Sequence, residues 1–193
     1  MPPASDLTVL RAFLAEFDPY LKSPVVFWPL SGRLAGGGEP PALTLGGLQL
    51  VRRRLAARQS QLAPADLTAY AQLDSQAETW LNRWPANIAH KASREISSRL
   101  NVWASALDEA GESPSAFAEN YKSAVGNRVY LALLTPLAGD APDAAPALAK
   151  LSALDGRLRR LIAPGDFVWE ADLAPDFDRD EFWFLYGKPQ LKK

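Results

Sequence analysis

The chain has 193 residues, the length of one domain, and a formal net charge of −1 at pH 7. Hydrophobic residues make up 48% of it and charged residues 22%, a composition typical of globular rather than disordered proteins. With no cysteine and a single histidine, the sequence excludes disulfides, thiolate zinc sites, cysteine nucleophiles and sites built from several histidines of one chain.

Apolar residues recur at helical spacing over residues 6–21 and predict a first helix, with Ser5 as its N-cap. The next segment, residues 23–43, is rich in aromatic residues, proline and glycine. We expect it to be extended and to pack on the surface of the protein. The reason is that proline lacks an N–H donor and disfavours the helical conformation in the residue before it.

The same spacing predicts six further helices, over residues 45–61, 64–83, 86–110, 114–121, 124–134 and 144–162. Thr44 is the predicted N-cap of the helix over 45–61, and Gly111 is the predicted C-cap of the helix over 86–110. Pro85 is expected to end or kink the helix over 64–83. In that helix, the apolar positions from Leu67 to Trp84 are expected to face the core.

Residues 164–193 have a different pattern, in which aromatic side chains are set among acidic residues and prolines. Such a segment is too apolar to stay in water and too irregular to form a core of its own. We therefore expect it to wrap over the helices. Taken together, the sequence predicts an all-α fold, an irregular bundle of about six or seven helices. It forms a single domain over residues 1–193, with 164–193 as a C-terminal extension.

Charge is distributed unevenly along the chain. Residues 1–62 contain seven Lys or Arg and four acidic residues, whereas residues 166–181 contain seven acidic residues and one base, Arg179. The two regions are expected to attract each other. Basic residues form two clusters, Arg53, Arg54 and Arg58 in the first and Arg157, Arg159 and Arg160 in the second. Both are expected to fan around the solvent side of their helices, whereas nucleic-acid binding would need one continuous positive surface.

His90 is the one side chain suited to proton transfer near neutral pH. On a helix it shares a face with Arg94, and no carboxylate is placed locally to orient the imidazole as a catalytic base requires. The acidic stretch that starts at Asp176 begins like a calcium loop. However, Glu181 and Gly187 stand where that loop needs glycine and glutamate. The sequence therefore predicts no catalytic site, no metal and no cofactor.

The leading hypothesis is a non-enzymatic protein–protein interaction or scaffold protein, because exposed Trp and Arg dominate the energetics of interfaces. Its candidate interaction residues are Trp80, Trp84, His90, Arg94, Trp169 and Trp183. One alternative is a nucleic-acid-associated protein that uses the arginine clusters at 52–58 and 157–160, and a less favoured one is an unrecognised enzyme. The sequence also leaves open whether the chain forms a homo-oligomer. It contains no evident secretory signal or membrane span, so we expect a cytoplasmic location and no membrane insertion.

Overall fold

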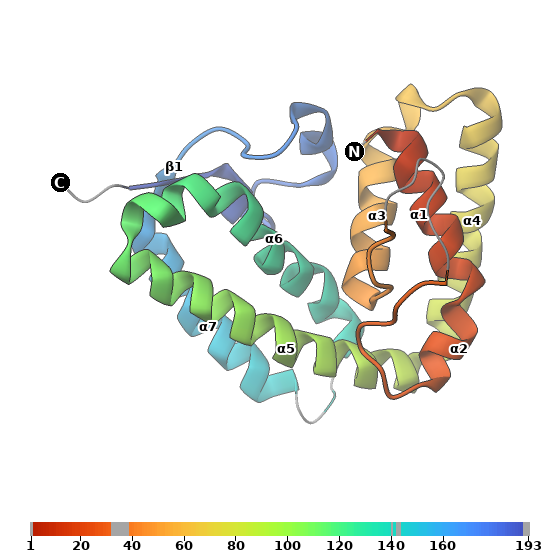
Figure 1. The fold of residues 1–193 in the computed structure, drawn as a ribbon, viewed down its shortest axis with the longest axis horizontal. Coiled ribbons are helices and arrows are strands. Elements are labelled where there is room, and N and C mark those ends of the chain that lie inside the picture. Colours follow the sequence, from red (N-terminus) through yellow and green to blue (C-terminus); the bar gives the residue numbers. More distant parts are fainter. Residues whose placement is uncertain (1, 32–38, 140, 142–143, 191–193) are drawn as a thin grey trace.

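The computed structural model describes residues 2–31, 39–139, 141 and 144–190, and helices dominate them (Figure 1). The α-helices are α1 (Pro3–Ala15), α2 (Phe17–Lys22), α3 (Leu45–Ala57), α4 (Pro64–Arg83), α5 (Pro85–Glu112), α6 (Pro114–Ala138) and α7 (Ala144–Leu161). Three short 3-10 helices, η1 (Gln59–Gln61), η2 (Ala171–Asp176) and η3 (Trp183–Tyr186), and two strands, β1 (Ile162–Pro164) and β2 (Gly187–Pro189), accompany them. The predicted all-α class is confirmed.

The helices form two groups that share α5. In Figure 1, helices α1 to α4 lie on one side, α6 and α7 lie on the other, and the long helix α5 runs past both. The helix α6 folds back along α5, and α7 also packs against α5. The helix α3 contacts both α1 and α6 and so connects the two groups.

The N-terminal helix begins earlier than predicted and is interrupted. It starts at Pro3, so Ser5 lies within the first turn and is not the N-cap. Proline is well tolerated there because the first helical N–H has no partner within the helix. The chain leaves the helical conformation at Glu16, which separates α1 from α2. Two helices therefore replace the single one expected over residues 6–21.

The carboxylate of Glu16 anchors the extended segment that follows α2. It accepts hydrogen bonds from Trp28 Nε1 at 2.7 Å and from the Ser31 N–H at 2.8 Å. Trp28 also pairs with Leu43 through two backbone hydrogen bonds of 2.8 and 3.0 Å, an isolated antiparallel bridge. Within the described residues, the segment over 23–43 is extended and packed on the helices, as predicted; residues 32–38 lie outside them.

A buried lysine fastens the start of this segment to α5. Lys91 Nζ donates to the carbonyl oxygens of Ser23 and Val25 at 3.0 and 2.7 Å, and lies 4.0 Å from the ring centroid of Tyr20. Burial of the ammonium group lowers the pKa of Lys91 to about 8. The backbone carbonyls and the ring thus replace a carboxylate as partners of this cation.

The predicted N-cap of α3 is confirmed, because Thr44 Oγ1 accepts a hydrogen bond from the Gly47 N–H at 2.9 Å. The start of α3 also lies very close to α5. The Gly46 N–H donates to Glu95 Oε2 at 3.1 Å, and a Cβ at Gly46 would stand 2.8 Å from Glu95 Oε1. Glycine at this position is therefore required for the approach of α3 to α5.

Proline 85 separates α4 from α5, as expected, and occupies the first turn of α5. Three other boundaries differ from the prediction. The helix α3 ends at Ala57, and the 3-10 helix η1 replaces the last turn expected up to residue 61. The helix α5 continues through Gly111 to Glu112, so Gly111 is not its C-cap. The helices expected over 114–121 and 124–134 are one helix, α6, which continues past Pro136 to Ala138. The residues between them favour helix, and the buried Tyr121 and Val125 keep the same face towards the core.

The helix α4 is less buried than its pattern predicted. Of its apolar residues, only Tyr70 and Ala77 are buried, while Leu67 is 41% exposed and Trp84, at the helix end, is 39% exposed. The helix lies at the edge of the bundle, where it packs mainly on α1 (Figure 1). A helix with one neighbour can bury only a narrow stripe, so the wide apolar face remains partly open.

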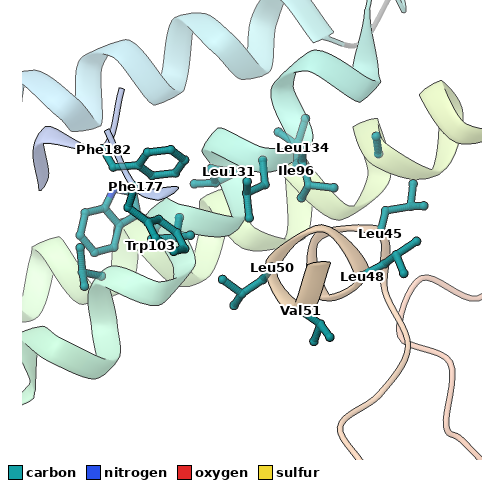
Figure 2. Close-up of a cluster of buried hydrophobic side chains, with 14 of the residues drawn as sticks. Leu45, Leu48, Leu50, Val51, Ile96, Trp103, Leu131, Leu134, Phe177 and Phe182 are labelled. Carbon is teal, nitrogen blue, oxygen red and sulfur yellow. The ribbon is translucent and has the colours of Figure 1, made fainter. Parts of the chain in front are cut away.

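Buried apolar side chains from every α-helix and from the C-terminal segment form one hydrophobic cluster. Figure 2 shows part of it, where leucines of α3 lie opposite residues of α5 and α6. Phe177 and Phe182 of the C-terminal segment enter the same cluster and pack edge-to-face, with 5.1 Å between their ring centroids. Both are fully buried, so these rings are part of the core and do more than cover it.

The C-terminal segment, residues 164–190 as described, is fastened to α6 by hydrogen bonds. Tyr121 donates to the Phe184 carbonyl at 2.7 Å, and Trp169 Nε1 donates to the Lys122 carbonyl at 3.0 Å. Together with its buried rings, these bonds confirm that the segment packs on the helices. The expectation that residues 1–193 form a single domain stays a prediction.

An antiparallel two-stranded ribbon ends the described chain and was not predicted. Strands β1 and β2 pair with Ala163 opposite Lys188, directly after the last turn of α7. A Cβ at Gly187 would stand 2.3 Å from Ile162 Cδ1, so any other residue at this position would require the Ile162 side chain to move. Three-residue strands are too short to produce a recognisable alternation of polar and apolar residues.

Candidate ligand-binding pocket

A pocket with a volume of about 260 Å³, called the ribbon pocket below, lies beside the two-stranded ribbon at the end of α7. It is lined by Arg159, Ile162, Ala163, Pro164, Arg179, Trp183, Tyr186 and Gly187. These residues come from the last turn of α7, from both strands and from the C-terminal segment. The pairing of β1 with β2 brings the three parts together, since β1 continues α7 and β2 follows η3.

One side of the pocket is formed by Arg159, which lies in the last turn of α7. Its guanidinium carbon is 3.8 Å from the ring centroid of Trp183. Trp183 in turn packs edge-to-face on the buried Phe184, with 5.7 Å between the ring centroids. A guanidinium stacked on a ring keeps the N–H donors in its plane free for a ligand.

The other arginine of the pocket, Arg179, is held by different partners. Its Nη2 donates to the Gly165 carbonyl at 3.4 Å, and its guanidinium carbon lies 5.2 Å from the ring centroid of Tyr186. The hydroxyl of Tyr186 donates to the Phe177 carbonyl at 2.9 Å, which fixes the ring. Both arginines therefore rest on aromatic rings whose own positions are set by the core.

The acidic residues beside Arg179 in sequence form no ion pair with it. Asp178 Oδ1 accepts hydrogen bonds from the N–H groups of Asp180 and Glu181, at 2.8 and 3.2 Å, and so stabilises the local turn. In the part of the chain that the structure describes, neither Arg159 nor Arg179 forms an ion pair. The charged side chains that line the pocket are these two, and both are positive.

The pocket is suited to binding an anionic group. A planar guanidinium binds a carboxylate or a phosphate through two parallel N–H donors. Among the lining residues, the one hydroxyl belongs to Tyr186 and already donates to a backbone carbonyl. The lining includes no carboxylate, imidazole or amine that could accept a proton.

The chain matches no protein-family model, no curated protein and no solved structure. Within the described residues, no group of three or more His, Cys, Asp or Glu side chains is arranged to hold a metal ion. No helix among the same residues has the length and apolar character to cross a membrane.

Two larger depressions differ from the ribbon pocket because their charged groups are already engaged. One of about 420 Å³ lies among α3, α4, α5 and α6, where Arg52 pairs with Glu78 and Arg53 pairs with Glu181. The other, of about 410 Å³, lies between α5 and α7. Its Arg94 donates to the Pro24 carbonyl at 2.6 Å and its Lys150 to Asn101 at 2.9 Å.

Two of the predicted interaction residues, Trp80 and Trp84, lie at the junction of α4 and α5. Trp80 is half-buried, with its ring centroid 6.1 Å from that of Phe17, whereas Trp84 is exposed. The guanidinium of Arg83 lies 5.9 Å from the ring centroid of Trp80 and 5.7 Å from that of Trp84. The two tryptophans thus share one cation, which sequence reasoning did not single out.

The remaining predicted interaction residues are separated from one another. His90 is exposed and, among the described residues, has no carboxylate partner, so a catalytic role has no support. Arg94 fastens the extended segment to α5. Trp169 anchors the C-terminal segment to α6. Of this set, Trp183 lies in the ribbon pocket, where it meets Arg159 from the predicted second basic cluster.

The first arginine cluster does not point into solvent as expected. Arg53 donates to the Asp176 carbonyl and lies 4.5 Å from the ring centroid of Phe182. Arg58 is buried, and its Nε donates to Asp172 Oδ2 at 2.8 Å. The reason is that the acidic C-terminal segment folds onto α3, so the predicted attraction between the two regions is realised as direct contacts.

The second cluster is also divided. Arg157 pairs with Asp108 at 2.7 Å, Arg159 lies in the ribbon pocket, and Arg160 is exposed on the same helix. The helices that carry the two clusters, α3 and α7, lie apart in Figure 1. This arrangement lacks the continuous positive face on which the nucleic-acid hypothesis depended, and we do not propose that function.

A buried polar cluster joins α1, α3 and the C-terminal segment. Asp6 is fully buried, with its Oδ2 3.2 Å from Arg54 Nε and 3.8 Å from Arg58 Nη1. Burial raises the pKa of Asp6 to about 6, although the nearby guanidiniums oppose that shift. Hydrogen bonds from Arg58 and Gln61 lower the pKa of Asp172 to about 2. Asp6 and Arg58 are buried, whereas Asp172 lies at the exposed edge of the cluster.

Sequence reasoning missed Arg179 and Tyr186 as members of the pocket. Arg179 is the single base among the seven acidic residues of 166–181, which was a usable signal. Nothing in the local sequence, however, places residue 179 beside the end of α7. The pairing of β1 with β2, which creates the proximity, depends on tertiary structure alone.

Proposed function

We propose that the chain is a non-enzymatic binding protein that takes an anionic group of a partner protein into the ribbon pocket. One observation carries this proposal: Arg159 and Arg179 line the same pocket, neither forms an ion pair with any residue that the structure describes, and each rests on an aromatic ring. Arginine, tryptophan and tyrosine are the residues that most often dominate binding at protein interfaces. This combination is what an anchor site for one charged side chain requires.

The size of the pocket favours a side chain of a partner over a free organic ligand. Pockets that enclose drug-sized molecules have volumes of roughly 300–1,000 Å³. The ribbon pocket, with about 260 Å³, lies below that range. A single side chain with a charged end fits such a volume, and the surrounding surface of the ribbon and η3 would contact the rest of the partner.

The test compares the partner proteins that the wild type and a variant without the two arginines capture from an extract of the source cells. The variant carries Arg159→Gln and Arg179→Gln together, and the matched control is Arg160→Gln, an exposed arginine next to Arg159 that does not line the pocket. We expect the wild type and the control to retain the same partner, and the double variant to lose it. Raising the salt concentration should release the partner from the wild type, because exposed charges are screened.

The stability of each variant is measured in parallel by urea unfolding. Both pocket arginines are exposed, so their replacement is expected to change the free energy of unfolding by less than about 0.5 kcal/mol. A loss of binding then reports on the pocket rather than on folding. Identical capture by all three proteins would refute the proposal.

A further inference from the structure

We infer that the anionic group that the ribbon pocket accepts is a phosphate monoester on a side chain of the partner. This inference rests on the proposed function and specifies its ligand. It follows from the number, the geometry and the fixation of the two pocket arginines, and from the absence of a carboxylate among the residues that line the pocket.

The charge of the pocket matches a dianion better than a carboxylate. Arg159 and Arg179 supply two positive charges, and the other lining residues are uncharged. A phosphate monoester carries a charge of about −1.5 to −2 at pH 7 and has three terminal oxygens that accept hydrogen bonds. A carboxylate carries one charge and has two oxygens, so it neutralises one of the two guanidinium charges and leaves the pocket with a net positive charge.

The two guanidiniums also reach the pocket from different elements. Arg159 comes from the last turn of α7, and Arg179 comes from the turn before η3. An anion between them can accept hydrogen bonds from two directions, which suits a tetrahedral phosphate more than a planar carboxylate. Since ring stacking and the bond from Arg179 to the Gly165 carbonyl already restrict both side chains, little further ordering is needed on binding.

The apolar part of the pocket offers a surface on which the carbon atoms of the phosphorylated side chain can pack. Ile162 and Pro164 of β1, with the rings of Trp183 and Tyr186, form the walls beside the arginines. A phosphate on a side chain brings methylene or aromatic carbons that can cover these walls. Inorganic phosphate lacks them, so it should bind more weakly than the same group on a peptide.

The experiment uses the full chain and four probes: three short peptides of one sequence with phosphoserine, glutamate or serine at the centre, and inorganic phosphate. Binding is followed through the indole N–H resonance of Trp183 in NMR titrations, assigned with the Trp183→Phe variant. We expect the phosphoserine peptide to bind at least about tenfold more tightly than the glutamate peptide and than inorganic phosphate. The serine peptide should not bind.

The arginine variants test the assignment of the donors. Arg159→Gln and Arg179→Gln should each lower the affinity for the phosphoserine peptide by at least about tenfold, which is the effect of one charge-assisted hydrogen bond. Arg160→Gln should change that affinity by less than twofold. Equal effects of Arg160→Gln and the pocket variants would overturn the inference.

The remaining outcomes separate this inference from the proposed function. If the glutamate peptide binds as tightly as the phosphoserine peptide, the phosphate inference is wrong, while loss of the captured partner from the double variant would still support an anion-binding pocket. If inorganic phosphate binds as tightly as the peptide, the group is not presented by a partner side chain, and the inference is wrong on that point. Absence of binding by every probe, with a partner still captured through the pocket, would also overturn it.

Discussion

Gly46 and Gly156 are both helical glycines, and their surroundings differ. A Cβ at Gly46 would stand 2.8 Å from Glu95 Oε1 and 3.1 Å from Tyr130 Cδ1, whereas a Cβ at Gly156 would meet nothing within 4 Å. The buried Glu95 is itself held by Arg99, whose Nη2 lies 3.1 Å from Glu95 Oε1. Glu95 therefore cannot move aside without loss of a buried ion pair.

We expect Gly46→Ala to destabilise the protein by about 1–3 kcal/mol, because the added methyl group separates α3 from α5. Gly156→Ala is the matched control, and it should stabilise the protein by up to about 1 kcal/mol, since alanine has the higher helix propensity. Urea unfolding followed by circular dichroism measures both. Equal effects of the two substitutions would contradict the close approach of α3 and α5.

At the same scale, sequence reasoning identified two of the four charged or aromatic residues that line the pocket, Arg159 and Trp183. Trp183 is singled out because exposed tryptophan is common in interfaces, and Arg159 because it belongs to a cluster of basic residues. They came from separate predictions, one of a basic patch and one of an interaction surface. Their contact, with 3.8 Å between guanidinium and ring, depends on the path of the chain between residues 160 and 182, which residue type cannot reveal.

Helices α6 and α7 are joined by an ion pair that is largely shielded from water. Arg128 Nε and Nη2 donate to the two carboxylate oxygens of Asp155 at 2.7 and 2.9 Å, and the guanidinium carbon lies 4.4 Å from the ring centroid of Phe184. The pair Arg157–Asp108 has the same 2.7 Å separation but is much more exposed. The two pairs therefore differ in burial and in the number of hydrogen bonds that join the side chains.

We expect Asp155→Ala to cost about 3 kcal/mol of unfolding free energy, because it leaves the buried guanidinium of Arg128 without a counter-charge. Asp108→Ala should cost less than about 0.5 kcal/mol, since exposed pairs are solvated and screened. The measurement is the midpoint of urea unfolding at pH 7. Comparable losses in the two variants would show that burial is not what distinguishes these pairs.

Helices were predictable from the sequence where the apolar periodicity was long and where the apolar side chains pack on the core along the whole helix. In α5, the predicted apolar positions from Ile88 to Leu107 are all buried, and Pro85 marks its start. The prediction failed for α6, which was divided in two, and for the exposed side of α4. Both errors arise from packing, because neighbouring helices decide whether a polar interruption is tolerated and whether an apolar face is covered.

Across the whole molecule, the C-terminal segment is fastened to both the N-terminal and the central helices. The buried cluster of Asp6, Arg54 and Arg58 meets Asp172 of this segment, so protonation of the two carboxylates affects how the parts of the chain hold together. The two pKa shifts have opposite signs, and they therefore act in different pH ranges.

We expect Asp6 to favour folding at low pH. Its pKa rises from 3.8 to about 6 on folding, so the folded state binds the proton more tightly, and the stabilisation is lost as the pH rises through 6. The difference in unfolding free energy between the wild type and Asp6→Asn should therefore fall between pH 3.8 and about 6, by at most about 1.4 kcal/mol per pH unit, and then level off.

The comparison variant is Asp172→Asn, which should show the opposite trend. The pKa of Asp172 falls from 3.8 to about 2, so its contribution is present above pH 3.8 and is lost as the pH falls towards 2. Urea midpoints measured from pH 2 to pH 8 test both residues. An Asp6 difference that grows as the pH rises would mean that Asp6 is ionised and paired with Arg54 throughout this range.

The amino-acid sequence determined the helical class, most helix positions and the extended course of the two aromatic segments, because helical periodicity and proline geometry are properties of neighbouring residues. Tertiary structure alone decided which charges meet. It placed Arg53 and Arg58 against the C-terminal segment, and it placed Arg159 and Arg179 beside the ribbon, where neither pairs with an acidic residue of the described ranges. Coulomb attraction acts through space, so the outcome depends on which side chains the folded chain brings within a few ångströms, and sequence separation carries little of that information.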